Sequence, residues 1–168
     1  MPPSADLKSS FAPVTDDGTR LLVLGSLPGE VSLRHAQYYA HPQNQFWRLM
    51  GQVVGADLAG AAYETRLATL RAAGVGLWDV VRTARRAGSL DTAIRDHQPN
   101  ALADLAATLP ALRAIAFNGG KASALGRLAL GADCRWTLID LPSSSPAYTI
   151  GFERKRIEWL KLTAFLSP

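Results

Sequence analysis

The stretch "RLLVLGSLPGE", residues 20–30, sets the fold class. Its first half, 20–25, is an apolar run closed by a glycine, which is typical of a strand buried inside a sheet. The overlapping "GSLPGE" (25–30) predicts a tight turn, because glycine lets the backbone bend sharply and approach a ligand closely. An ordinary turn between a strand and a helix has the same composition, so this motif alone does not establish a binding loop.

The rest of the chain alternates apolar runs with amphipathic segments. Further strands are predicted at 75–81, 112–120 and 135–142. Helices are predicted at 44–55, 61–74, 101–112, 121–130 and 153–166. Because strands and helices alternate, we predict an α/β protein whose parallel sheet is covered by helices on both faces and joined by right-handed crossovers. Such sheets bind their ligands beyond the carboxyl ends of the strands, in the loops that follow them.

Length and composition limit the classes of protein that the chain can form. Its 168 residues have room for one domain with a sizeable core. It contains no run of ~18 apolar residues, which argues against a membrane-spanning helix, and its N-terminus lacks the pattern of a secretory signal. We interpret the polar residues 1–19 as a flexible arm and residues 20–168 as a single domain.

The single cysteine and the charge balance bear on the cellular compartment and on the partners of the protein. Cys134 alone excludes a disulfide framework and a multi-cysteine metal site within one chain, and it favours a reducing, cytoplasmic setting. Lys and Arg total 18 against 14 Asp and Glu, a formal net charge of +4, which permits a nucleic-acid partner without establishing one. His35, His41 and His97 lack metal-ligand spacing, so we expect neither a metal nor a cofactor.

The segment "QYYAHPQNQFW" (37–47) crowds amides between aromatic rings, which suits a pocket for a flat, hydrogen-bonding ring. Pro42 disfavours helical geometry at His41 and can open the next helix, with Asn44 in its first turn. An amide there can orient a water molecule or bond a ring N–H. A helix-capping asparagine explains the same pattern, and His41 is interpreted as structural.

The aromatic residues of this segment divide into two groups. At least one of Tyr38 and Tyr39 is placed to stack on a nucleobase. Phe46 and Trp47 continue with helical spacing, which is typical of core residues packed beneath such a pocket.

Asp79 stands at the carboxyl end of the otherwise apolar strand predicted at 75–81. A carboxyl group is costly to bury unless it binds something, so it is a candidate acceptor for a ring N–H. An ion pair with Arg82 or Arg85 explains it equally well. The run "RTARRAGS" (82–89) holds three arginines and no acid, which fits either phosphate binding or a solvated basic loop.

The stretch "LPSSSPAY" (141–148) places Ser143, Ser144 and Ser145 between two prolines after the last strand. Hydroxyl and backbone N–H groups commonly contact phosphates. A loop stiffened by prolines can press into a duplex, with Pro146 and Ala147 as a small apolar wedge. No Gly-x-Ser-x-Gly elbow supports a serine nucleophile.

Together these loops resemble the uracil-DNA glycosylase superfamily, and within it the hypoxanthine-DNA (deoxyinosine) glycosylase branch. The resemblance rests on "GSLPGE" (25–30), "QYYAHPQNQFW" (37–47), "GLWDVV" (76–81), "GSLD" (88–91), "FNGGKA" (117–122) and "LPSSSPAY" (141–148). These segments span most of the chain in the family's order. The resemblance implies a three-layer α/β/α fold with a central four-stranded parallel sheet. It also implies hydrolysis of the N-glycosidic bond of a deaminated base flipped out of DNA.

The chain departs from the family pattern at three positions. Leu27 stands where many relatives carry a water-activating Asp, Asn or Glu, and the resemblance implies that Asn44 takes over this task. Leu141 stands where many relatives carry a His or Asn that contacts the leaving base. Asp79 stands where many carry a base-reading Asn, and an ionised carboxylate accepts hydrogen bonds but cannot donate them.

From the loops and the resemblance we expect one site. The catalytic residue is Asn44. The base is held by Gly25, Ser26, Leu27, Tyr39, Phe46, Asp79 and Asn118. DNA is contacted by Pro28, Gly29, Arg82, Arg85, Ser143, Ser144, Ser145, Pro146 and Ala147. No lysine is clearly placed as a Schiff-base nucleophile, so we expect a monofunctional glycosylase.

The expected partner is double-stranded DNA that contains a deaminated base, hypoxanthine first, and we expect a monomer. Three alternatives remain open. The first is a glycosylase that prefers uracil or G·U mismatches. The second is a binder of damaged DNA that has lost the chemistry, in keeping with Leu27 and Leu141. The third is a hydrolase or binding protein for small nucleosides or nucleotides.

Overall fold

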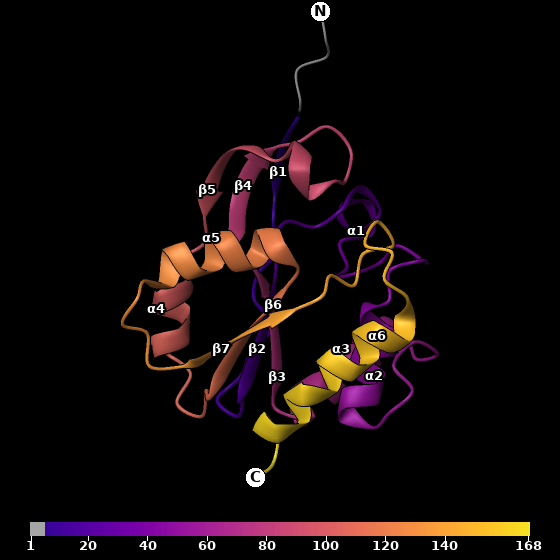
Figure 1. The fold of residues 1–168 in the computed structure, drawn as a ribbon, viewed down its shortest axis with the longest axis vertical. Helices are drawn as coiled ribbons and strands as arrows, with labels where there is room; N and C mark the ends of the chain where they lie inside the picture. The colour runs from indigo at the N-terminus through magenta and orange to yellow at the C-terminus, as the bar shows by residue number, and fades with distance from the viewer. Residues whose placement is uncertain (1–5) are drawn as a thin grey trace, which may run out of the picture.

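Two β-sheets organise the computed structural model, which describes residues 6–168 (Figure 1). The larger sheet is parallel, with the strand order β3-β2-β6-β7. Its strands are β2 (Leu21–Gly25), β3 (Val75–Asp79), β6 (Ala114–Asn118) and β7 (Thr137–Leu141). This four-stranded parallel sheet confirms the predicted fold class.

Helices cover both faces of this sheet because its central strand is apolar on both sides. Leu21 and Val23 of β2 face the cluster that contains side chains of α2, α3 and α6, while Leu22 and Leu24 face the cluster formed with α4 and α5. The helices are α1 (Glu30–His35), α2 (Phe46–Val54), α3 (Tyr63–Ala72), α4 (Leu102–Ala107), α5 (Gly120–Leu130) and α6 (Phe152–Trp159), with 3-10 turns η1 (Asp91–Ala93) and η2 (Leu160–Phe165). Side chains that alternate between faces thus give the three layers of Figure 1.

A second, antiparallel sheet was not predicted. Its order is β1-β4-β5, formed by β1 (Leu7–Ser9), β4 (Val81–Arg85) and β5 (Arg95–Pro99). The strand predicted at 75–81 therefore ends at Asp79, and the predicted basic loop 82–89 begins as strand β4. In Figure 1 this sheet lies above the parallel sheet, beyond the ends of its strands.

The prediction of a flexible arm is wrong for the part of it that the structure describes. β1 pairs with β4, and Lys8 forms an ion pair with Glu30 of α1. Val14 and Leu77 exchange two backbone hydrogen bonds of 2.9 Å. Residues 1–5 of the predicted arm lie outside the described residues. Residues 6–19 are thus part of the folded domain.

Across residues 6–168, no helix is both long enough and apolar enough to span a membrane.

Candidate active site

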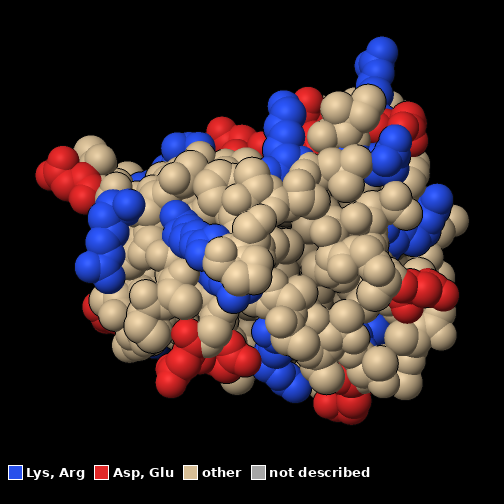
Figure 2. Space-filling model, turned by 90° about the horizontal axis from the view of Figure 1, so that it is seen from below, with Lys and Arg blue, Asp and Glu red and all other residues tan. Residues whose placement is uncertain are grey.

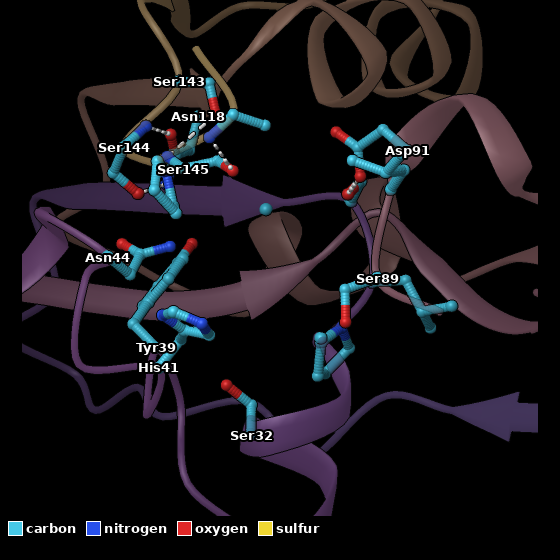
Figure 3. Close-up of a pocket in the computed structure, with 18 of the residues that line it drawn as sticks. Ser32, Tyr39, His41, Asn44, Ser89, Asp91, Asn118, Ser143, Ser144 and Ser145 are labelled. Carbon is cyan, nitrogen blue, oxygen red and sulfur yellow. Dashed lines mark hydrogen bonds between the residues drawn. The ribbon is translucent and has the colours of Figure 1, made fainter. Parts of the chain in front are cut away.

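A cavity of about 480 Å³ opens at the carboxyl ends of β2, β3 and β6. Gly25, Asp79 and Asn118 end these three strands and lie side by side on its floor, since Gly25 pairs with Asp79 and the preceding Leu24 with Phe117. Loops from distant parts of the chain complete the lining, namely 26–32, 38–44, 89–92 and 143–148 (Figure 3). The position beyond the strand ends is the one the sequence predicts.

Gly25 brings two polar side chains together on the floor of the cavity. A Cβ atom at this position would stand 2.6 Å from Asp79 Oδ1 and 2.9 Å from Tyr39 Oη. Tyr39 Oη and Asp79 Oδ2 are both buried and have no hydrogen-bond partner within the described residues. Unpartnered buried polar atoms are uncommon because desolvation is costly, so this pair is a candidate for contact with a ligand.

Burial raises the pKa of the Asp79 carboxyl to about 7. The charge of Asp91 raises it as well, while Arg86 opposes the shift. Burial, and then the charge of Asp79, also raise the pKa of Tyr39. Tyr39 is therefore a hydroxyl donor at neutral pH, and Asp79 lies near the midpoint between acceptor and neutral acid.

Both tyrosines belong to the cavity lining, but their contacts differ. Tyr38 is 4% exposed, and its hydroxyl donates to the carbonyl of Ala12 at 2.9 Å, so it ties the lining to the N-terminal segment. Tyr39 lines the cavity and stacks on Phe46 with ring centroids 3.9 Å apart. Phe46 is fully buried and does not reach the lining, so the structure places it behind Tyr39 rather than in contact with a bound base.

Asn44 lines the cavity just before α2, in the loop that also carries Tyr39 and His41 (Figure 3). Its Oδ1 accepts a hydrogen bond of 2.9 Å from the backbone N–H of Phe46. This bond fixes the orientation of the amide, and one lone pair of Oδ1 remains for a further donor. Asn44 thus lies one residue before the N-cap Gln45, outside the predicted first turn, but it still satisfies a backbone N–H at the helix start while it faces the cavity.

The serine–proline loop 143–148 is held from beneath by buried polar side chains. Asn118 donates to Ser144 Oγ at 2.8 Å and accepts from the Ser144 N–H at 2.8 Å. Lys155, which is 1% exposed, donates to the carbonyl of Ser145, and Trp159 donates to that of Pro142. Asn118, predicted to bind the base, thus uses both ends of its amide to position this loop.

A buried arginine that the sequence analysis did not single out supports the opposite side of the cavity. Arg86 is fully buried, and its guanidinium donates to the carbonyls of Leu27, Pro28 and Gly88. It therefore joins the "GSLPG" loop to the loop that follows β4. The sequence did not distinguish Arg86 as buried, because the basic run 82–89 contains three arginines and nothing in their spacing separates them.

The predicted residues of the "GSLPG" loop all reach the cavity. Ser26, Leu27, Pro28 and Gly29 are in its lining, and the Ser26 hydroxyl donates to Asp91 Oδ1 at 2.5 Å. Leu27 is 6% exposed and packs with apolar residues of β4 and Ile94, so this position offers no polar group to a water molecule.

Leu141, the last residue of β7, is likewise apolar and buried, 4% exposed. It belongs to the core cluster beneath α2 and α6 and is not among the residues that line the cavity.

The predicted basic contacts lie outside the cavity. Arg82 and Arg85 are exposed on β4 and are not in the lining, which contains no lysine or arginine among the described residues. It does contain Glu30, Asp79 and Asp91. The lining of the cavity is thus suited to an uncharged ring rather than to a phosphate. On the opposite end of the molecule, the face away from β1, β4 and β5, basic and acidic side chains are interspersed (Figure 2).

A parallel sheet whose strand ends hold a cavity beneath a serine–proline loop is the arrangement that the resemblance to uracil-DNA glycosylases implies. The family model described as the Uracil DNA glycosylase superfamily matches residues 12–165. The chain belongs to the uracil DNA glycosylase superfamily.

Individual relatives agree with this assignment over most of the chain. It is 46% identical to a hypoxanthine DNA glycosylase of Methanosarcina barkeri, over 68% of this chain and 72% of that one. It is 41% identical to a hypoxanthine DNA glycosylase of Methanosarcina acetivorans, over 91% of this chain and 96% of that one. A solution NMR structure of a candidate uracil DNA glycosylase from Methanosarcina acetivorans superposes with a TM-score of 0.85 at 40% identity, over 96% and 99% of the two chains.

Proposed function

We propose that this protein is a monofunctional DNA glycosylase that hydrolyses the N-glycosidic bond of hypoxanthine flipped out of double-stranded DNA. The observation that carries the choice of a base with a ring N–H beside a carbonyl is the pair of buried, unpartnered polar atoms Tyr39 Oη and Asp79 Oδ2, whose side chains meet beside Gly25. The names of the two Methanosarcina relatives support the same substrate.

This pair consists of one donor and one acceptor. Hypoxanthine presents a ring N–H beside a carbonyl oxygen, so the tyrosine hydroxyl donates to the carbonyl and the ionised carboxylate accepts from the N–H. Adenine presents the reverse pattern at these positions, an acceptor nitrogen beside an amino donor. With adenine in the site, the Asp79 carboxylate would face the lone pair of the ring nitrogen. Because the buried polar groups would then lack partners, the site discriminates strongly against adenine.

Asn44 orients the attacking water. The free lone pair of its Oδ1 accepts a water hydrogen, while the bond from Phe46 N–H holds the amide in place. The water oxygen attacks C1′ of the deoxyribose as the bond to the base breaks, through a transition state with oxocarbenium character. The leaving base keeps the bond electrons, and the Tyr39 hydroxyl stabilises the charge that develops on its carbonyl. The proton that the attacking water gives up passes through solvent to the departed base, so the products are neutral hypoxanthine and a C1′ hydroxyl.

Water, rather than a side chain, is the nucleophile. Among the described residues the cavity lining contains no lysine that would form a Schiff base with the sugar. The product is an abasic site in an intact strand. The serine–proline loop and the "GSLPG" loop contact the flanking backbone, and a single copy of the chain suffices for the site.

Uracil is the second candidate substrate, because it presents the same pair of a ring N–H beside a carbonyl. The hydrogen-bond pattern of Tyr39 and Asp79 therefore does not separate the two bases. The names of the two Methanosarcina relatives favour hypoxanthine, and the cavity of about 480 Å³ is large enough for a purine.

A panel of duplexes tests the proposal. Matched duplexes carry one deoxyinosine, uracil, xanthine or adenine, and abasic sites are revealed by alkaline cleavage under single-turnover conditions. We expect deoxyinosine to be excised fastest and adenine not at all, with no strand cleavage before alkali. Excision of uracil with deoxyinosine untouched would reverse the substrate choice, and inactivity on the whole panel would favour a binding protein.

A further inference from the structure

Two large apolar side chains stay exposed at the mouth of the cavity. Leu90 is 58% exposed and Tyr148 is 46% exposed, and both belong to the cavity lining. They come from different loops. Figure 3 shows Ser89 and Asp91, the neighbours of Leu90, across the cavity from the loop of Ser143–Ser145.

The backbone on both sides of Leu90 is fixed to the rest of the site. Ser89 Oγ accepts from the Glu30 N–H at 2.9 Å, and Asp91 Oδ1 accepts from the Ser26 hydroxyl at 2.5 Å. The carbonyl of Gly88 accepts from Arg86 Nε at 2.8 Å. The Leu90 side chain is thus held outward on a braced loop, although burying a leucine is worth about 2 kcal/mol.

The opposite rim presents Pro146, Ala147 and Tyr148 of the serine–proline loop, and the Tyr148 ring lies against Lys155 of α6, with Nζ 5.6 Å from the ring centroid. A nucleotide that leaves the stack opens a gap the size of a base, and glycosylases and architectural proteins stabilise such distortions with an inserted apolar side chain. Pro146 and Ala147 are too small to fill such a gap alone, whereas leucine is one of the side chains that serve as wedges.

We propose that Leu90 is a second wedge, which inserts into the base stack beside the extruded nucleotide from the rim opposite the serine–proline loop. The proposal rests on the proposed excision of a flipped base. It assigns a DNA-distorting role to the loop between β4 and η1.

The test compares Leu90→Ala with Leu128→Ala, a matched control, because Leu128 is 81% exposed on α5 outside the cavity lining. Excision of deoxyinosine is measured in duplex and in single-stranded DNA. We expect Leu90→Ala to lower kcat/KM on the duplex about tenfold and to leave the single strand unchanged, because only the duplex has to be opened. Leu90→Met should restore most of the loss, and Leu128→Ala should match the wild type.

A second readout does not depend on cleavage. The fluorescence of 2-aminopurine next to the deoxyinosine rises when the stack opens, and Leu90→Ala should reduce this rise. Equal duplex rates and equal fluorescence in Leu90→Ala and wild type would overturn the wedge, and so would equal losses on duplex and single strand. A wild type that opens the stack through Leu90 but excises nothing would refute the proposed excision while supporting the wedge.

Discussion

Asn44 has two tasks at the start of α2 that substitutions can separate. Asn44→Ala removes both the hydrogen bond to the Phe46 N–H and the contact to water. We expect it to lower the single-turnover rate constant for deoxyinosine about 10²–10³-fold and the free energy of unfolding by about 1 kcal/mol. Asn44→Ser keeps an oxygen that can accept from the Phe46 N–H but is too short to hold the water. It should therefore keep the wild-type free energy of unfolding and lose the single-turnover rate.

Binding to an uncleaved duplex serves as the control for both Asn44 variants. If they bind like the wild type but do not cleave, the amide acts on the chemical step. Full activity in Asn44→Ser would show that another group orients the water, and the bond to Phe46 would then be the whole role of Asn44.

Asp79 lowers stability where it is ionised, because its carboxylate is buried without a partner for Oδ2. Its pKa is about 7 in the folded protein against 3.8 for a free carboxyl. Between these values the folded state binds a proton that the unfolded state lacks, so stability falls as the pH rises through this window. Asp79→Asn should therefore raise the free energy of unfolding by roughly 2 kcal/mol at about pH 8 and change it little near pH 4.

Urea unfolding at the two pH values measures this difference, with Asp133→Asn as an exposed control. The Asp79→Asn protein should also excise deoxyinosine more slowly, since it loses the anionic acceptor. A variant that is less stable than the wild type at pH 8 would show that the folded protein compensates the charge. At this scale the sequence predicted that Asp79 is special, but only the fold shows that its Oδ2 is left without a partner.

Strands with an apolar run were predictable, and the polar, exposed strands of the second sheet were not. β2 and β6 are continuous apolar runs, and their positions follow from that pattern. β5 is exposed along its whole length, and the pairing of β4 with β5 shifts register between Val81 and Thr83 and again before Arg85. The alternation of buried and exposed residues is therefore broken, and the composition looks like that of a basic loop.

Arg86 connects this unpredicted sheet to the active site, which makes it the test of the sheet's role. Arg86→Met removes the donors to the carbonyls of Leu27, Pro28 and Gly88 and leaves them buried. We expect the free energy of unfolding to fall by about 3 kcal/mol and KM for duplex DNA to rise. Arg86→Lys should be intermediate, because an ammonium group does not reproduce the planar fork.

Thermal unfolding and steady-state excision measure the two effects, with Arg154→Met on the exposed side of α6 as the control. A stable Arg86→Met protein with normal KM would mean that the two loops hold their positions without the guanidinium. The sheet would then be a structural addition with no bearing on the site.

For the molecule as a whole, the sequence predicted which loops meet but not how their side chains share the work. The carboxyl ends of parallel strands converge, so Gly25, Asp79 and Asn118 had to lie close together. Whether Asn118 contacts a base or braces Ser144 depends on the path of the 143–148 loop, which depends in turn on α6 through Lys155. Such long-range packing has no local signature in the chain.

The distribution of charge over the molecule leads to the last prediction. DNA affinity falls with salt in proportion to the number of phosphates that lysines and arginines neutralise, with a log–log slope of about −0.9 for each. The described cavity lining offers serine hydroxyls and acids but no lysine or arginine. We therefore expect a slope of about −3 or shallower between about 50 and 200 mM salt, measured by fluorescence anisotropy on an uncleavable duplex.

The single-turnover rate at saturating enzyme should not change over this range, because the groups proposed for the chemistry are uncharged or buried. A slope of about −6 or steeper would contradict the prediction. It would mean that the duplex also covers the exposed basic side chains of β4 and β5, Arg82 and Arg95 among them, and that the second sheet is part of the DNA-binding surface.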